Sequence, residues 1–297
     1  MSHITKTYLL ETEYTNYNVQ IKYKGVQLNP STKFANETEE IKYLYDNARS
    51  FEIFVGGTEY CSNISVFSRR ETTASINKLE YNKKCNITED LESGVGTRHL
   101  LNTSMNFVLR MFPHVTAFIL NDASTKDCDK TKKHSVSLIH YYLVFYGETW
   151  YSKIFHAHLK RDTEHYKILQ LFLTKLRDSS NKKPYIEFYN IFLRNTNIQK
   201  QIIKYDIENM YNSSNNYDEF FSKLKDNISD KTELCIFVSY FLTQFVNSIF
   251  DFSSLAFADW YINKDTVVKI EINLPIKPFV SQYGGKKIKY QTFLKLF

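Results

Sequence analysis

The pattern of apolar and polar positions divides the chain into a strand-rich first half and a helix-rich second half. Apolar and polar residues alternate, or β-branched and aromatic residues cluster, over several short stretches of the first half. This pattern predicts β-strands at 7–14, 17–25, 50–57, 63–70 and 74–85. The polar segment 26–49 between them is expected to form a loop with a short helix near 38–48.

A change of periodicity follows the strands. Apolar residues from Leu100 to Phe112 recur at steps of three and four, which predicts a helix over 97–111 that Pro113 ends. The nearly continuous apolar run 114–122 is typical of a strand that is covered on both faces. Beyond it we expect a helix at about 135–147, helices over most of 161–262, and a closing strand over 265–276 whose inward face holds Val268, Ile270, Ile272 and Leu274.

Composition narrows the class of protein. The chain has 297 residues, 43% of them hydrophobic, with 22 Tyr and 23 Phe, so it can bury a substantial core. Its net charge of +6 permits a polyanionic partner without requiring one. The short basic clusters, Lys130–Lys133 and Lys286–Lys289, are interpreted as solvated loops.

The four cysteines lie far apart in the sequence, and none forms a C-x-x-C pair, so no structural metal site is expected. The N-terminus lacks the cationic and apolar regions of a signal peptide. The apolar stretch 234–250 is interrupted by polar residues and predicts a buried helix rather than a membrane span. These features favour a cytoplasmic protein, in which the Asn-x-Ser/Thr triplets at Asn63 and Asn86 would stay unmodified.

A glycine pair, Gly94 and Gly96, lies just before the helix expected at 97–111. A loop that opens onto a helix N-terminus exposes unpaired N–H groups and the positive end of the helix dipole, and both favour phosphate. No G-K-[ST] follows, so the loop is not a P-loop, and His99 stands where a dinucleotide fingerprint would have its third small residue.

The order of elements from 50 to 160 resembles the GCN5-related N-acetyltransferase (GNAT) family. In that family antiparallel strands lead to a Q/R-x-x-G-x-G/A loop, a helix, a strand and a second helix that ends near a tyrosine. The loop here reads Leu91-Glu92-Ser93-Gly94-Val95-Gly96-Thr97, with the glycine spacing of the family but Leu91 in place of Gln or Arg. In overall style the chain also resembles proteins of giant DNA viruses, some of which carry such a core.

The resemblance implies a fold, a cofactor and a set of roles. The fold would be α+β, a GNAT-like mixed sheet with flanking helices plus an appended or inserted helical subdomain. Its parts would be an extension (1–49), the core (50–160), the helical subdomain (161–262), and a closing strand with tail (263–297). Acetyl-CoA would be the cofactor, with Tyr151 as the acid that protonates the leaving thiolate and Glu80 as the best carboxylate candidate for the base. Its pyrophosphate would lie on the glycine loop, which comprises Gly94, Val95, Gly96, Thr97 and Arg98.

Each of these assignments has a structural alternative. The glycines could form a plain turn, Tyr151 could be a packing residue, and Glu80 could be a solvated side chain on a strand. Three functions therefore stay open: an acyltransferase acting on an amine, a non-catalytic interaction or structural module of the same fold with a protein partner, and a nucleic-acid or cap-binding module that stacks bases on its aromatic residues.

Overall fold

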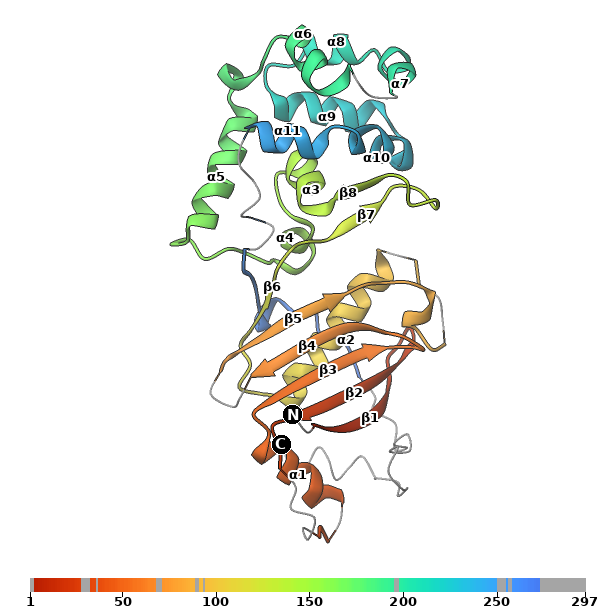
Figure 1. The fold of residues 1–297 in the computed structure, drawn as a ribbon, viewed down its shortest axis with the longest axis vertical. Helices are drawn as coiled ribbons and strands as arrows, with labels where there is room; N and C mark the ends of the chain where they lie inside the picture. The colour runs from red at the N-terminus through yellow and green to blue at the C-terminus, as the bar shows by residue number, and fades with distance from the viewer. Residues whose placement is uncertain are drawn as a thin grey trace. The chain divides into compact units, whose positions relative to one another are not determined.

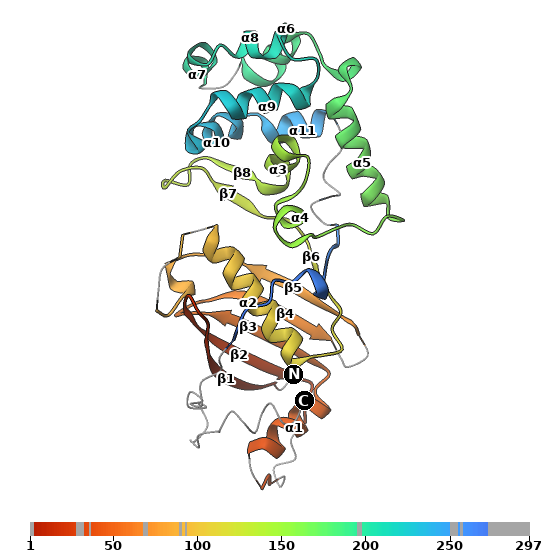
Figure 2. The same ribbon diagram turned by 180° about the vertical axis from the view of Figure 1, so that it is seen from behind.

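The computed structural model describes residues 3–27, 33–35, 37–67, 71–88, 91–92, 94–194, 198–249, 255 and 258–272. It divides into two compact units, shown as a ribbon in Figures 1 and 2. The first unit contains Met1–Leu120 and Tyr261–Phe297, and the second contains Asn121–Trp260. The expected core, 50–160, is therefore shared between the units, because the chain leaves the sheet after Leu120.

A seven-stranded sheet forms the first unit, in the order β1-β2-β3-β4-β5-β6-β9. The pairs from β1 to β5 are antiparallel, and β5 pairs with β6 in parallel. The strands are β1 (His3–Glu11), β2 (Asn16–Lys24), β3 (Ser50–Gly56), β4 (Tyr60–Phe67), β5 (Thr73–Leu79), β6 (Ala117–Leu120) and β9 (Trp260–Asn263).

Alternation along the strands directs one set of side chains into the core. In β2 the residues Tyr17, Val19, Ile21 and Tyr23 are buried, while the residues between them are half-buried. Helix α2 (Val95–Met111) lies behind the sheet in Figure 1 and in front of it in Figure 2, so it covers one face. Its periodic apolar positions are buried, as the sequence predicts. A second helix of this unit, α1, spans Glu37–Asn47.

The connection from β5 through α2 to β6 links two parallel strands. Their register runs from Thr73 opposite Ala117 to Ile76 opposite Leu120, where β6 ends. Strand β5 continues beside β4 to Leu79, so β5 and β6 part beyond Ile76. The register between β4 and β5 also shifts there, because Asn63 faces Lys78 and Ile64 faces Ile76. This leaves Asn77 as the extra residue of a β-bulge.

The second unit combines a hairpin with helices. Strands β7 (Thr125–Asp127) and β8 (Ser135–Ser137) are antiparallel. The helices are α3 (Leu138–Tyr146), α4 (Trp150–Phe155), α5 (Glu164–Arg177), α6 (Tyr185–Phe188), α7 (Gln199–Lys204), α8 (Ile207–Asn212), α9 (Tyr217–Asn227), α10 (Lys231–Ser239) and α11 (Leu242–Ile249), with a π-helical turn at Tyr189–Leu193. Short 3₁₀ turns occur in both units, at Lys83–Cys85, Ser179–Asn181 and Lys264–Thr266.

Aromatic side chains fill the core of this unit. The ring of Phe188 lies 4.7 Å from that of Tyr211 and 5.5 Å from that of Phe220, centroid to centroid. Phe245 packs against Phe221 at 5.0 Å. Packing thus accounts for many of the Phe and Tyr residues of the helical unit.

Two disulfides pair all four cysteines. Cys61 of β4 is bonded to Cys85 in the 3₁₀ turn after β5, and Cys128 in the β7–β8 hairpin is bonded to Cys235 of α10. Each bond lies within one unit, so each restrains a loop or hairpin against the core of its own unit.

The structure confirms an α+β fold with a mixed sheet and a helical region. The prediction of a strand over 265–276 is wrong for the described part of that range. The strand lies earlier, at Trp260–Asn263, and a 3₁₀ turn follows it. The segment after this turn is held by side chains of α2. Asn106 Nδ2 donates to Val268 O, and Arg110 Nη1 donates to Ile272 O. The remainder of that expected strand, with Leu274, lies outside the described residues.

Among the described residues, every helix is too short or too polar to cross a membrane.

Candidate functional site

The glycine loop lies at the N-terminus of α2, as the sequence predicts. Gly94 is the N-cap residue, with helical backbone angles of φ −69° and ψ −39°, and Val95 is the first residue of the helix. Gly94, Val95 and Arg98 are exposed, Thr97 is half-buried, and Gly96 is buried. The five residues proposed to cradle a phosphate are therefore brought together at one helix end.

Two amides of this loop are already bonded within the protein. Gly96 N donates to Glu92 O at 2.8 Å, and Arg98 N donates to Gly94 O at 3.2 Å. The first N–H groups of a helix are normally without a backbone partner, and for that reason they can bind anions. Because a turn precedes α2, the Gly96 amide is not available in this way.

The side chain of Tyr81 covers Gly96. A Cβ atom added at Gly96 would lie 1.9 Å from Tyr81 Cζ and 2.3 Å from its Oη, so the phenol occupies the space that glycine leaves open. The hydroxyl donates to Leu91 O at 3.1 Å and accepts from Leu91 N at 3.2 Å, and Asn86 Nδ2 also donates to it. Tyr81 is therefore held in place by three hydrogen bonds to the loops around the helix N-terminus. Tyr81 was not predicted as a site residue, because in the sequence it is only an aromatic residue within the strand expected at 74–85.

His99 has a structural role one turn further along α2. It is buried, and its Nε2 shares a hydrogen bond of 2.9 Å with Thr12 Oγ1. The ring of Tyr14 meets it edge-on at 5.1 Å. Burial lowers the pKa of His99, so the neutral imidazole fastens the β1–β2 turn to α2.

Glu80 follows β5 in the first unit and is largely solvated. Its side chain is 64% exposed, and its carboxylate forms an ion pair of 3.1 Å with Lys78 Nζ. Glu80 is thus placed as a solvated, ion-paired side chain at the end of a strand.

Tyr151 belongs to α4 in the second unit, so the two residues proposed for catalysis lie in different units. Tyr151 is only 5% exposed and packs edge-on against Trp150 at 4.8 Å. Its Oη lies 3.4 Å from Ser124 Oγ. Burial and the charge of Asp122 raise the pKa of the phenol, which makes it a weaker acid than a free tyrosine.

Asp122, two residues after the end of β6, is a buried carboxyl that the sequence pattern did not single out as functional. It is 1% exposed, its Oδ1 accepts from Ser124 N at 3.4 Å, and its buried Oδ2 has no hydrogen-bond partner within the described part of the chain. Burial raises the pKa of Asp122 to about 6. The two carboxyls thus differ: Glu80 is a solvated side chain, whereas Asp122 is desolvated beside two hydroxyl groups.

A cavity of about 840 Å³ lies at the other end of α2. Asn106, Leu109 and Arg110 line it from the helix, and Val267, Ile270 and Ile272 line it from the segment after β9. It is thus formed by the C-terminal half of α2, whereas the glycine loop stands at the N-terminal end.

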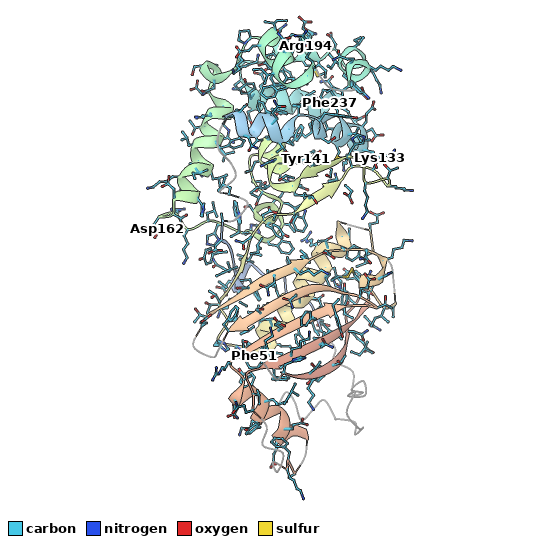
Figure 3. All side chains as sticks on the ribbon, viewed as in Figure 1. Phe51, Lys133, Tyr141, Asp162, Arg194 and Phe237 are labelled. Atoms are coloured by element: carbon cyan, nitrogen blue, oxygen red, sulfur yellow. A yellow bond between two sulfur atoms is a disulfide. The ribbon has the colours of Figure 1, made fainter. Side chains whose placement is uncertain are left out.

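The basic loop of the second unit is the tip of the β7–β8 hairpin. Lys130, Lys132 and Lys133 lie there, Lys132 forms an ion pair of 3.7 Å with Asp127, and Lys133 projects from the hairpin in Figure 3. The second basic cluster, Lys286–Lys289, lies outside the described residues. No group of three or more His, Cys, Asp or Glu side chains that could hold a metal ion occurs within the described ranges.

Comparison with models of known protein families, with curated protein sequences and with solved structures finds no match for this chain.

Proposed function

We propose that the chain is a non-catalytic interaction module built on an α+β sheet whose phosphate-cradle position is filled by its own side chain. The contact of Tyr81 with Gly96 is the observation that carries this proposal. A cofactor cradle must leave room for the ligand and free N–H groups to bind it. Here the phenol takes the room, and the amides of Gly96 and Arg98 have intramolecular partners.

The placement of the candidate catalytic groups supports the same conclusion. A solvated, ion-paired Glu80 and a buried Tyr151 of raised pKa are both unsuited to the roles that the GNAT resemblance implies. The helical unit, by contrast, presents several large apolar side chains to solvent. Ile186, Ile191 and Ile203 are 65%, 39% and 80% exposed. We expect a protein partner rather than a small molecule to use this unit.

Calorimetric titration with acetyl-CoA at millimolar concentration tests the proposal. The wild-type protein is expected to show no saturable heat, because displacing Tyr81 would break its three hydrogen bonds. The variant Tyr81→Ala removes the phenol, and its titration asks whether the emptied space alone can take the ligand. Saturable binding by the wild-type chain would overturn the proposal.

An N-acyltransferase with acetyl-CoA as cofactor and an amine as acceptor remains the second candidate. The parting of β5 and β6 beyond Ile76 favours it, together with the bulge at Asn77. Such a split exposes strand N–H and C=O groups that could bind an extended ligand beside the helix N-terminus. For this function Tyr81 would have to leave Gly96 when the cofactor binds.

A further inference from the structure

All four cysteines are consumed by disulfides, and all four are buried. Structural disulfides form where an oxidising partner accepts the electrons of the thiols, and they are rare where thiol reductants dominate. The chain must therefore meet an oxidant while it folds.

The same chain carries Asn-x-Ser/Thr triplets that its fold buries. Asn63, Asn86 and Asn102 each begin such a triplet, and they are 8%, 7% and 3% exposed. Asn63 lies in the central strand β4, where its Oδ1 accepts from Asn77 Nδ2 at 2.7 Å. Asn102 lies within α2 on its buried side.

In Asn86, the side-chain nitrogen that would carry a glycan already forms a hydrogen bond within the protein. Asn86 Nδ2 donates to Tyr81 Oη, beside Gly96. An Asn-linked glycan is bulky and belongs on a surface. A glycan on Asn63, Asn86 or Asn102 would thus be incompatible with the sheet, with the contacts of Tyr81 or with the packing of α2. Three further triplets begin at Asn36, Asn212 and Asn227. Asn212 and Asn227 are exposed and could carry a glycan, and Asn36 lies outside the described residues.

We propose that the chain acquires its disulfides from a dithiol oxidase in a compartment without Asn-linked glycosylation. The secretory pathway of eukaryotic cells supplies oxidation and glycosylation together, and the fold accepts oxidation but no glycan at the three buried triplets. Three buried acceptor triplets would put the chain at risk each time it passed that pathway. The origin of the disulfides is independent of any ligand at the glycine loop.

The oxidation is a disulfide transfer. A thiolate of one cysteine pair attacks the oxidase disulfide, forms a mixed disulfide and displaces one oxidase thiolate. The second thiolate of the pair then attacks its own partner's sulfur and displaces the other oxidase thiolate. Each pair loses two electrons and two protons, and the oxidase disulfide is reduced to a dithiol.

The test expresses the full chain along two routes. One is a bacterial cytoplasm that contains an oxidised dithiol oxidase, and the other is the secretory pathway of a eukaryotic cell, entered through an added signal peptide. On the first route we expect folded protein whose intact mass is lower than that of the fully reduced chain by four hydrogen atoms. On the second we expect glycans on the buried triplets and loss of secreted, folded protein.

Matched variants identify the cause of that loss. Ser65→Ala, Thr88→Ala and Ser104→Ala together remove the buried triplets without changing the asparagines, and their folding is checked first on the bacterial route. These changes are expected to restore secretion, whereas Asn212→Gln with Asn227→Gln is not. Two results would overturn the proposal: wild-type protein that is secreted folded without a glycan on Asn63, Asn86 or Asn102, or folded protein that keeps four free thiols beside the oxidase.

Discussion

The phenol of Tyr81 lies in the space that a side chain at Gly96 would need. The substitution Gly96→Ala is therefore expected to lower the free energy of unfolding by about 1–3 kcal/mol, the usual cost of overpacking a filled core. Urea denaturation would measure it. In a Tyr81→Ala background the same change should cost less, so the double-mutant cycle should show coupling.

Gly94 provides the control for this measurement. A Cβ at Gly94 would have no atom within 4 Å, and the residue already has helical angles. Gly94→Ala is thus expected to be neutral, or stabilising by about 0.4–1 kcal/mol through the unfolded chain. Equal losses for Gly94→Ala and Gly96→Ala would contradict the assigned position of Tyr81.

Asp122 should make stability depend on pH. Its folded pKa of about 6 lies above its ordinary value of 3.8, so the folded state holds the proton more tightly between these values. Stability from this group is fully present below about pH 4, is lost as the pH rises to about 6, and is constant above. The loss of folding stability across this pH range is on the order of 3 kcal/mol.

The comparison with Asp122→Asn isolates this effect. Burial lowers the pKa of His140 to about 4, and its contribution changes in the opposite direction, because the unfolded chain binds the proton more tightly. His140 is common to both proteins, so the difference between their stability curves should fall from pH 4 to pH 6. Parallel curves would show that Asp122 is not desolvated in the folded protein.

Tyr151 is expected to act through packing. Tyr151→Phe removes only a hydroxyl whose contact with Ser124 is 3.4 Å long, and should cost no more than about 1 kcal/mol. Tyr151→Ala empties a buried aromatic site and should cost about 3–5 kcal/mol. A loss of acetyl transfer in Tyr151→Phe at unchanged stability would instead support the acid role.

The two disulfides should contribute unequally. The bond between Cys61 and Cys85 closes a separation of 24 residues, whereas the bond between Cys128 and Cys235 closes 107. Chain-entropy arguments assign about 3 and about 5 kcal/mol to loops of these lengths. Replacing both cysteines of a disulfide by alanine should therefore lower the free energy of unfolding more in the second unit than in the first. Urea denaturation of the two variants would measure this difference. The reverse order would indicate that the longer loop is already restrained in the unfolded chain.

The sequence predicted what depends on local periodicity. Neighbouring residues determine helix α2, through its apolar steps, and the end of that helix before Pro113. They also determine the strands of the first half. It did not predict the 3₁₀ turn after Asn263, because the bonds from Asn106 and Arg110 that hold the following segment come from more than a hundred residues away.

The candidate site shows the same limit. A glycine pair before a helix predicts the backbone position of the loop, and the structure has it there. Whether that loop is open depends on Tyr81, which reaches Gly96 across a turn whose path no local pattern determines. The pairing of Cys128 with Cys235 is likewise a consequence of tertiary packing, since the two residues belong to elements far apart in the sequence.

The most direct test of a closed glycine loop observes its amides. The chain contains only 8 Gly, so selective ¹⁵N-glycine labelling gives a spectrum simple enough to follow Gly94 and Gly96 individually. During titration with coenzyme A we predict unchanged chemical shifts for both amides and slow hydrogen exchange at Gly96, whose N–H is bonded to Glu92 O. Saturable shifts at Gly94 and Gly96 on addition of coenzyme A would contradict it.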